Sequence, residues 1–457
     1  MAVGAQSEPG GAIAAYFKFA ERGTNLATEV KAGVTTFMVM AYILLVNPSI
    51  LAAAGIPIPA ASAATALIAG VMTLAMGIVA NVPIALAAGL GINGAVAFGL
   101  VLTNGLTPAG AMGVIVLEGI VVTILVLVGL REAIMKAVPL SLKRAIGAGI
   151  GLFILFIGFI DAGIIVKTGG SSAENPVPVT FVFPTETAHF VFWLGLVLTI
   201  LLWARRIPGA LLISILVTSA VAIAVGIQGV PATFTATPDF STIGAFDLTN
   251  VFAVLGTLAA ILTIFSFMLT DFFDTMGTAT AIVEQAGLTD ENGKIPEVGK
   301  LLFVDSLGAA IGGMAGVSSN TSYIESSAGV AEGGRTGLTS VVVGILFLLS
   351  IFLAPIAGII PAQATAPVLI LVGFLMCSLI KDIDFGDFEE GLPALLAITL
   401  MPLTYSITVG IGAGFVMWAL IKAVRGKASQ VPVLMWVVAV AFLVYFAQDL
   451  LGQSFSA

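Results

Sequence analysis

Residues 32–80 read AGVTTFMVMAYILLVNPSILAAAGIPIPAASAATALIAGVMTLAMGIVA, and none of them is charged. A membrane helix needs about 20 consecutive apolar residues, so this stretch is long enough for more than one crossing. The uncharged region continues to Leu117, and a second one runs from Thr336 to Ile380. No soluble surface can be built from such stretches. We therefore predict an all-α polytopic membrane protein.

The composition supports this prediction and excludes several functions. Charged residues make up 9% of the chain, against about 25% in soluble domains. The net charge of −8 and the lack of a basic cluster argue against nucleic-acid binding. A single cysteine, Cys377, allows no internal disulfide, and a single histidine, His189, excludes sites that need two. We predict no cofactor and no metal centre, and we recognise no set of enzyme catalytic groups.

Carboxylates interrupt one apolar segment, FSFMLTDFFDTMGTATA at residues 265–281. Asp271, Asp274, Thr275 and Thr278 recur at helical spacing, so a helix would carry them on one polar stripe. A carboxylate inside a membrane helix is costly and is by default a functional hypothesis. One aspartate could instead lie in water at a helix end or pair with a distant lysine. We predict that Asp274, which lies among the threonines, is a site residue with Asp271 as its neighbour.

A second polar segment, GVSSNTSYIESSAGVAEGGRTG, covers residues 316–337. Residues 318–322 are small and polar, and such backbone at membrane depth must be buried in protein or line a cavity. Ser322 and Glu325 have the spacing of a capping box, which predicts that a helix begins there and points its N–H groups at the cavity. Glu325 could cap this helix, or its carboxylate could accept hydrogen bonds from a substrate.

Isolated polar residues in other apolar segments each have two explanations. Asn93, in VPIALAAGLGINGAVAF at 82–98, could join two helices or bind a heterocycle through its amide. Glu118 in VIVLEGIVV and Asp305 in LFVDSLGAA could support helix packing or take part in ion coupling. We favour packing for these two acids, and Glu118 stays a candidate for coupling.

Two apolar segments, at 83–98 and 322–335, are short and rich in small residues. In each half of the chain, the short segment begins a similar number of residues after the first long apolar segment. The second half has a longer interval because it contains the polar loop near residues 284–300. Two halves that each contain an interrupted third helix are typical of inverted-repeat transporters. Basic residues precede the first segment, so the positive-inside rule predicts a cytoplasmic N-terminus. These residues are Lys18, Arg22 and Lys31.

Five stretches of the sequence carry a family resemblance. The two most specific are DFFDTMGT (271–278) and SNTSYIESSAGVAEGGRTGLT (319–339). The others are TTFMVMAYILLVNP (35–48), PIALAAGLGINGAVAF (83–98) and PLTYSITVGIGAGF (402–415). Together they resemble the AzgA-type purine permeases of the nucleobase–cation symporter-2 group, also called the nucleobase–ascorbate transporters. The resemblance covers almost the whole chain.

The resemblance implies a fold of fourteen membrane segments in two inverted seven-segment repeats. Segments 1–4 and 8–11 would form a core domain, and segments 5–7 and 12–14 a gate domain. Segments 3 and 10 would be half-helices preceded by short strands that cross at mid-membrane, as in the uracil permeases. The implied division is a cytoplasmic N-terminal segment at 1–31, a core at 32–130 and 251–360, and a gate at 131–250 and 361–457 that includes the C-terminus.

The resemblance also implies roles for single residues. Asp274 lies where related uracil permeases have a substrate-binding glutamate, Glu325 matches the glutamate that binds the base, and Asn93 matches an asparagine of the purine subgroup. Thr275 stands where those permeases carry a histidine, so a carboxylate would have to carry any coupled proton. The expected substrate site is Asp274, Glu325, Asn93, Thr275, Thr278, Ser322 and Tyr323. The candidates for proton coupling are Asp274, Glu325, Asp271 and Glu118.

We therefore expect a secondary active transporter of the cell membrane, and not an enzyme, that imports adenine, guanine or hypoxanthine by alternating access. A purine presents N–H groups that an ionised carboxylate accepts, and burial favours the protonated carboxyl group, which suits proton symport. The alternatives are sodium coupling, or a permease for uracil, xanthine or another heterocycle. Two acids facing the site argue against an anion substrate. Relatives form dimers through the gate domain, so a homodimer in the lipid bilayer is expected.

Overall fold

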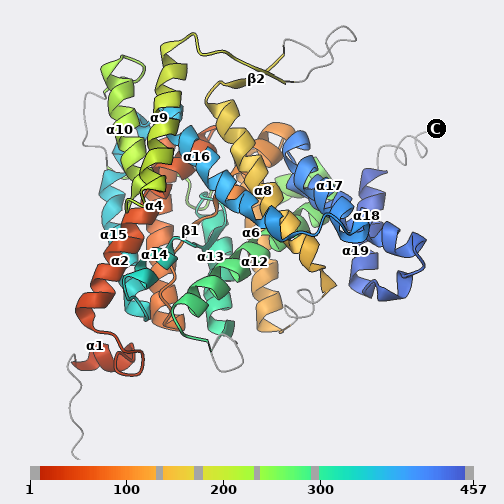
Figure 1. Cartoon of the computed structure of the whole chain (residues 1–457), viewed down its shortest axis with the longest axis horizontal. Helices are drawn as coiled ribbons and strands as arrows, with labels where there is room; N and C mark the ends of the chain where they lie inside the picture. Colours follow the sequence, from red (N-terminus) through yellow and green to blue (C-terminus); the bar gives the residue numbers. More distant parts are fainter. Residues whose placement is uncertain (1–10, 130–136, 169–178, 231–236, 290–297, 448–457) are drawn as a thin grey trace, which may run out of the picture.

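The computed structural model describes residues 11–129, 137–168, 179–230, 237–289 and 298–447. Helices dominate it, and Figure 1 shows them gathered around the short central strand β1. In the described part of the chain, nine helical stretches are long and apolar enough to cross a membrane. The predicted helical polytopic membrane protein is thereby confirmed. The outer ends of the expected N-terminal and C-terminal segments, residues 1–10 and 448–457, lie outside the described residues.

The first half of the chain supplies helices and strands with the following bounds. The helices are α1 (Gly11–Tyr16), α2 (Leu26–Met40), α3 (Ile43–Ala52), α4 (Ile58–Ala75), α5 (Leu90–Gly94), α6 (Pro108–Leu127), α8 (Leu140–Asp161), α9 (Thr187–Ala204) and α10 (Ala210–Ala224). Two π-helical stretches, η1 (Met76–Ala80) and η2 (Ala95–Thr103), extend α4 and α5. The strands are β1 (Leu86–Ala88), β2 (Ile165–Lys167) and β3 (Val179–Phe181).

The second half begins at the short helix α11 (Leu248–Leu255). The further helices are α12 (Thr257–Gln285), α13 (Val298–Met314), α14 (Ser326–Ala331), α15 (Gly337–Leu349), α16 (Ala362–Cys377), α17 (Phe388–Thr404), α18 (Ile407–Val424) and α19 (Val433–Phe446). Strand β4 (Asn320–Ser322) precedes α14. The 3₁₀ stretches are η3 (Ser350–Ile359), η4 (Ser378–Asp382) and η5 (Ala428–Gln430).

Side-chain caps determine where several helices begin. The Thr107 hydroxyl accepts the N–H of Gly110, and Pro108 takes the first position of α6, where its missing N–H costs nothing. Helix α15 is capped from another helix, because the buried Glu29 carboxylate of α2 accepts the backbone N–H groups of Thr336 and Thr339. The polar end of the 316–337 segment thus ties the start of α15 to α2.

Strands β1 and β4 pair in the middle of the molecule. They run antiparallel, with Leu86 opposite Ser322 and Ala88 opposite Asn320. The N–H of Tyr323 donates to the Ala85 carbonyl at 2.9 Å and extends the pairing by one step. All six strand residues are buried. Non-helical backbone at membrane depth is tolerated because the partner strand satisfies its hydrogen bonds.

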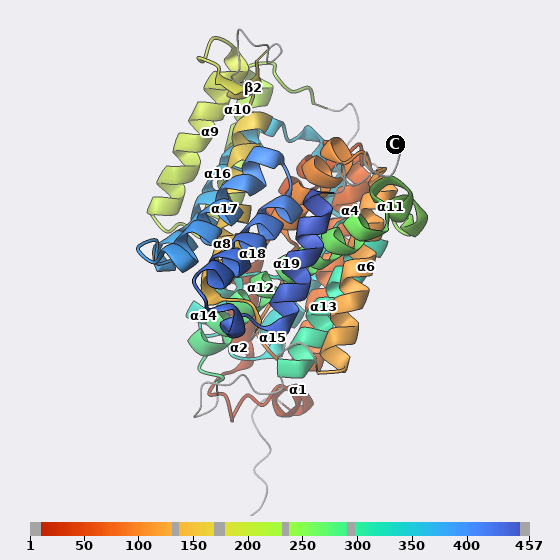
Figure 2. The ribbon, with the colours of Figure 1, turned by 90° about the vertical axis from the view of Figure 1, so that its right-hand side faces the viewer.

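The helices pack into two groups. In one group α4 packs on α15, α6 on α13, and α2 on α14 and α15. In the other group α8 lies along α16 and α17, α9 contacts α10 and α16, and α18 contacts α17 and α19. Figure 2 shows α9, α16 and α17 on one side of the molecule, and α4, α6 and α13 on the other. The paired strands belong to the first group.

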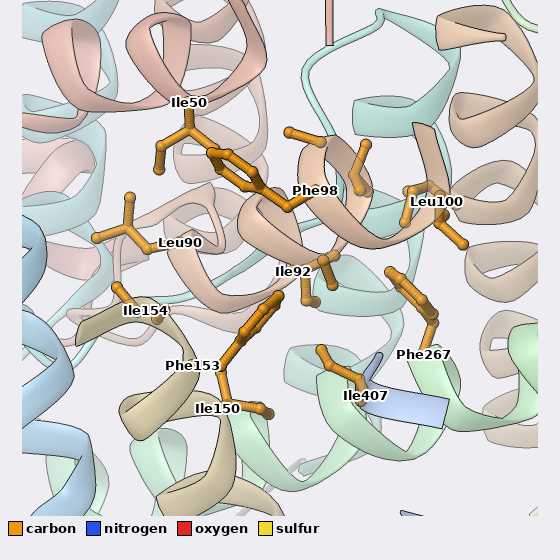
Figure 3. Close-up of a cluster of buried hydrophobic side chains, with 14 of the residues drawn as sticks. Ile50, Leu90, Ile92, Phe98, Leu100, Ile150, Phe153, Ile154, Phe267 and Ile407 are labelled. Carbon is orange, nitrogen blue, oxygen red and sulfur yellow. The ribbon is translucent and has the colours of Figure 1, made fainter. Parts of the chain in front are cut away.

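One place where the two groups meet is the contact of α5 with α8. Figure 3 shows Leu90 and Phe98 on the side of α8 that carries Phe153 and Ile154. Gly91 makes this close approach possible: a Cβ atom there would lie 2.2 Å from Cγ2 of Ile150. The interface is therefore apolar and tightly packed.

Candidate functional site

A cavity of about 610 Å³ lies between the two helix groups. One wall is formed by α12 and α14, and the other by α8 and α16. A smaller recess of about 90 Å³ shares part of this lining and reaches the strands and α5. We call the two together the central cavity. The residues that line both parts are Asp274, Thr278, Ile324, Glu325, Val372 and Met376.

Glu325 sits at the N-cap position of α14 and faces the central cavity. Its side chain does not cap the helix, so the predicted capping box is wrong. The reason is that Ser322 is bound elsewhere: its hydroxyl and N–H both donate to Oδ1 of Asp305, at 2.8 and 3.0 Å. The carboxylate of Glu325 accepts instead the hydroxyl of Tyr42, at 2.7 Å. This bond leaves acceptor capacity for a ligand.

Asp274 brings a second carboxylate to the central cavity from α12. Its Oδ2 accepts a long hydrogen bond, 3.3 Å, from the hydroxyl of Thr321. Thr278, one turn further along α12, also lines the cavity. Lys143 of α8 lines the larger part and stands over the ring of Phe273, 5.7 Å from its centroid. Two carboxylates, several hydroxyl groups and Lys143 thus line a mostly apolar space.

Three predicted site residues make internal hydrogen bonds. Thr275 is fully buried, is not part of the cavity lining, and donates its hydroxyl to Oδ2 of Asp305 at 2.7 Å. Ser322 lines the recess, but its donors go to Asp305 as described above. Tyr323 lines the recess as well, and its hydroxyl donates to the carbonyl of Ala88 on β1. These bonds hold the strands in place.

The remaining predicted residues lie outside the lining of the central cavity. Asn93 is fully buried on α5, and neither atom of its amide has a hydrogen-bond partner among the described residues. Asp271 is buried on α12, where Oδ1 accepts the hydroxyl of Ser319 at 3.0 Å. Glu118 is fully buried on α6, and both of its carboxylate oxygens lack a hydrogen-bond partner in the described residues.

Tyr42 is a cavity residue that was not predicted from the sequence. A signal was present, because a tyrosine inside an apolar membrane segment needs a partner for its hydroxyl. Ile324, Val372 and Met376 carried no such signal, since apolar residues in an apolar chain cannot be sorted by position. Within the described ranges, no group of three acidic, histidine or cysteine residues is placed to hold a metal ion.

The cavity can hold a flat ligand that has polar edges. Carboxylates accept N–H groups at the rim, and Ile324, Val372 and Met376 offer apolar contact to a ring face. Hydrogen bonds between N–H donors and an ionised acceptor are stronger than neutral ones. The arrangement suits an aromatic heterocycle with N–H donors along one edge.

Comparison with known proteins agrees with this chemistry. A family model described as "Permease family" matches residues 27–413. Adenine permease AdeQ of Escherichia coli is 40% identical over 437 residues, which cover 95% of this chain and 96% of the relative. Guanine/hypoxanthine permease PbuG of Bacillus subtilis is 38% identical over 450 residues, which cover 94% and 98%. A putative permease of Methanocaldococcus jannaschii is 40% identical over 433 residues, which cover 94% and 97%.

Solved structures share the fold at low sequence identity. The transmembrane domain of a cyanobacterium bicarbonate transporter, BicA, has a TM-score of 0.60 at 16% identity and covers 85% of this chain and 97% of its own. Murine Slc26a9 in the inward-facing state has a TM-score of 0.61 at 12% identity and covers 93% and 74%. These likenesses show a common membrane-transporter fold.

Proposed function

Because this chain belongs to the permease family of the nucleobase–cation symporter-2 group, we propose that it is a secondary active transporter that imports adenine, guanine or hypoxanthine. The named relatives span nearly its whole length and are adenine and guanine/hypoxanthine permeases. The observation that carries the proposal is the pair of carboxylates, Asp274 and Glu325, that face one central cavity from α12 and α14.

The purine would bind between these two acids. Its N–H groups would donate to the carboxylates of Asp274 and Glu325, while Thr278 supplies a further polar contact. Ile324 and Met376 would pack against the ring. Tyr42 would orient Glu325 through its 2.7 Å hydrogen bond. Ser322, Tyr323 and Thr275 would support the binding strand through their hydrogen bonds.

We assign the fourteen-segment, two-repeat arrangement and its core and gate domains to this chain on the basis of its helix contacts. The hairpin of α9 and α10 beside α16 corresponds to the hairpin of α17 and α18 beside α8. The pair β1–α5 corresponds to β4–α14. The core would hold the first helix group, 32–130 and 251–360, and the gate the second, 131–250 and 361–457. Helix α19 would lie outside the repeats.

Transport would proceed by alternating access, with the core moving against the gate. The central cavity supports this, because its walls come from both helix groups. We propose proton symport, a cell-membrane location in which residues 1–31 form a cytoplasmic N-terminal segment, and a homodimer through the gate. A proton suits this chain because several of its carboxyl groups are buried, and burial favours the protonated form.

Uptake into proteoliposomes tests this function. Radiolabelled adenine, guanine and hypoxanthine would be compared with uracil and xanthine, under a pH gradient, alkaline inside, or under a sodium gradient. Purine uptake that follows the pH gradient and is lost in Asp274→Asn and Glu325→Gln would support the proposal. Asp384 and Glu332 are exposed, so Asp384→Asn and Glu332→Gln are the matched controls for the two site variants. Both controls should keep wild-type uptake. Full purine uptake in both site variants, uptake of uracil alone, or sodium-driven uptake would contradict it.

A further inference from the structure

Three carboxylates lie together in the first helix group, away from the lining of the central cavity. They are Glu118 on α6, Asp271 on α12 and Asp305 on α13, with exposed fractions of 0%, 1% and 3%. Helix α6 packs against both α12 and α13, and a Cβ atom on Gly119 would lie 2.3 Å from the Ala310 nitrogen of α13. We call Glu118, Asp271 and Asp305 the buried acids.

Strand β4 joins the buried acids to the central cavity. Its alternating side chains reach two helices, as expected for a strand. Ser319 just before it donates to Asp271, and Thr321 donates to Asp274, both on α12. Ser322 points the other way and donates to Asp305 on α13. The same strand continues into Tyr323 and Glu325, so a displacement of β4 would reach the cavity.

The buried acids differ sharply in their hydrogen bonds. Asp305 accepts three, from the Thr275 hydroxyl and from the hydroxyl and N–H of Ser322. Asp271 accepts one, from Ser319, and its Oδ2 has no partner in the described residues. Glu118 accepts none there. Hydrogen bonds stabilise an ionised carboxylate, so Asp305 is the best suited of the three to carry charge and Glu118 the least.

The surroundings of Glu118 add further negative charge. Asp305 on α13 interacts electrostatically with Glu118, and Asp271 on α12 does so with Glu118, Asp305 and Asp274. The other titratable residues on these two helices, Lys300 and Glu284, are exposed, and η2 carries none. Helix α11, which also packs on α6, carries none either, and its cap is the half-buried Asp247.

An unpaired buried charge is strongly unfavourable, and several like charges in one space are more so. A proton on Glu118 removes the charge that has no hydrogen bond to stabilise it. It also lowers the repulsion felt by Asp271, which holds β4 through Ser319. Protonation of Glu118 can therefore affect the position of β4, the strand next to the cavity residues.

We propose that Glu118, together with Asp271, binds the coupling proton at a site separate from the purine cavity. This proposal rests on the proposed purine transport. In the step itself a hydronium ion at one membrane face gives its proton to the carboxylate, an O–H bond forms, and a water molecule is left. At the other face water takes the proton back. Asp274 and Glu325 then serve the purine and not the proton.

The test separates accumulation from exchange in proteoliposomes. A pH gradient of one unit, alkaline inside, could drive purine accumulation up to about tenfold if one proton moves per purine. Wild-type protein and the control Glu332→Gln should approach this ratio. Glu118→Gln, a neutral isostere of the protonated acid, should reach a ratio of about one, while exchange of radiolabelled adenine, guanine or hypoxanthine across equal pH persists. Asp271→Asn should behave in the same way.

The outcomes distinguish this proposal from the proposed function. If wild-type protein does not exchange any of the three purines, the proposed function fails. If wild-type protein exchanges them and Glu118→Gln still accumulates about tenfold, the proton site is wrong. A sodium gradient that drives the wild type but not Glu118→Gln would make this a sodium site and overturn the proposal as well. If Glu118→Gln exchanges no purine at all, the Asp271→Asn variant decides the question. Purine accumulation by Asp271→Asn overturns the proposal, and purine exchange without accumulation supports it.

Discussion

Gly91 allows the two helix groups to touch, and an alanine there should disrupt their packing. The added Cβ would lie 2.2 Å from Cγ2 of Ile150, whereas apolar carbons pack at about 3.5–4.0 Å. More than 1 Å of space must therefore come from a shift of α5 or α8. Overpacking of this kind costs about 1–3 kcal/mol. Gly91→Ala should lower the free energy of unfolding by that amount, although alanine favours a helix.

A double-mutant cycle identifies the cause. Ile150→Ala removes Cγ2 and costs about 2–5 kcal/mol by itself, but in the Gly91→Ala background it should cost about 1–3 kcal/mol less. Ile150→Val keeps a methyl group at the clashing position and should give no such rescue. Gly299→Ala, where no atom lies within 4 Å of the added carbon, is the matched control.

The assay is denaturant unfolding of the purified variants in detergent micelles, followed by tryptophan fluorescence. Purine exchange in proteoliposomes would be measured on the same variants. The ranking of the variants by exchange rate should follow their ranking by free energy of unfolding. Additive effects of Gly91→Ala and Ile150→Ala would refute the reasoning. An equal rescue by Ile150→Val would refute it too, because the contact with Cγ2 would then not be the source of the cost.

Three further predictions concern single side chains. Tyr42→Phe removes the hydroxyl that orients Glu325, so purine affinity measured by calorimetry should fall about tenfold or more; unchanged affinity would show that Tyr42 only packs. Glu29→Gln weakens the cap of α15 and should cost about 1–3 kcal/mol, seen as a lower thermal midpoint. The Thr249 hydroxyl and the Asn250 N–H lower the pKa of Asp247, so this cap contributes stability above about pH 4 that is lost as pH falls further. Hydrogen exchange in α11 should accordingly speed up below that pH in the wild type, and Asp247→Asn should abolish this dependence.

Much of the fold follows from the sequence because membrane helices need long apolar segments. The polar stripe of Asp271 and Asp274 was predicted from helical spacing, and both acids are on α12 as expected. The stripe does not reveal that Asp274 reaches the cavity while Asp271 points to Ser319. That difference depends on the position of β4, which pairs with a distant strand.

The capping box failed for a related reason. The spacing of Ser322 and Glu325 is local, but Ser322 is held by Asp305 on α13. Local patterns give way when a buried acid from another helix needs the same donor. The apolar wall from α16 could not be predicted at all, since Val372 and Met376 resemble the other apolar residues of that helix. Asp274 and Glu325 were candidates from the sequence pattern, the family resemblance pointed to the same two acids, and the structure added Tyr42.

The pairing of β1 with β4 has a consequence for synthesis in the cell. Ala88 and Tyr323, joined through the tyrosine hydroxyl, are 235 residues apart in the chain. A ribosome that adds about 5–20 residues per second needs roughly 10–50 s to cover that distance. During this time the edge of β1 has no strand to pair with, and its backbone cannot rest in lipid. The first half of the protein must therefore wait beside the insertion machinery, or in contact with water, until its second half is made.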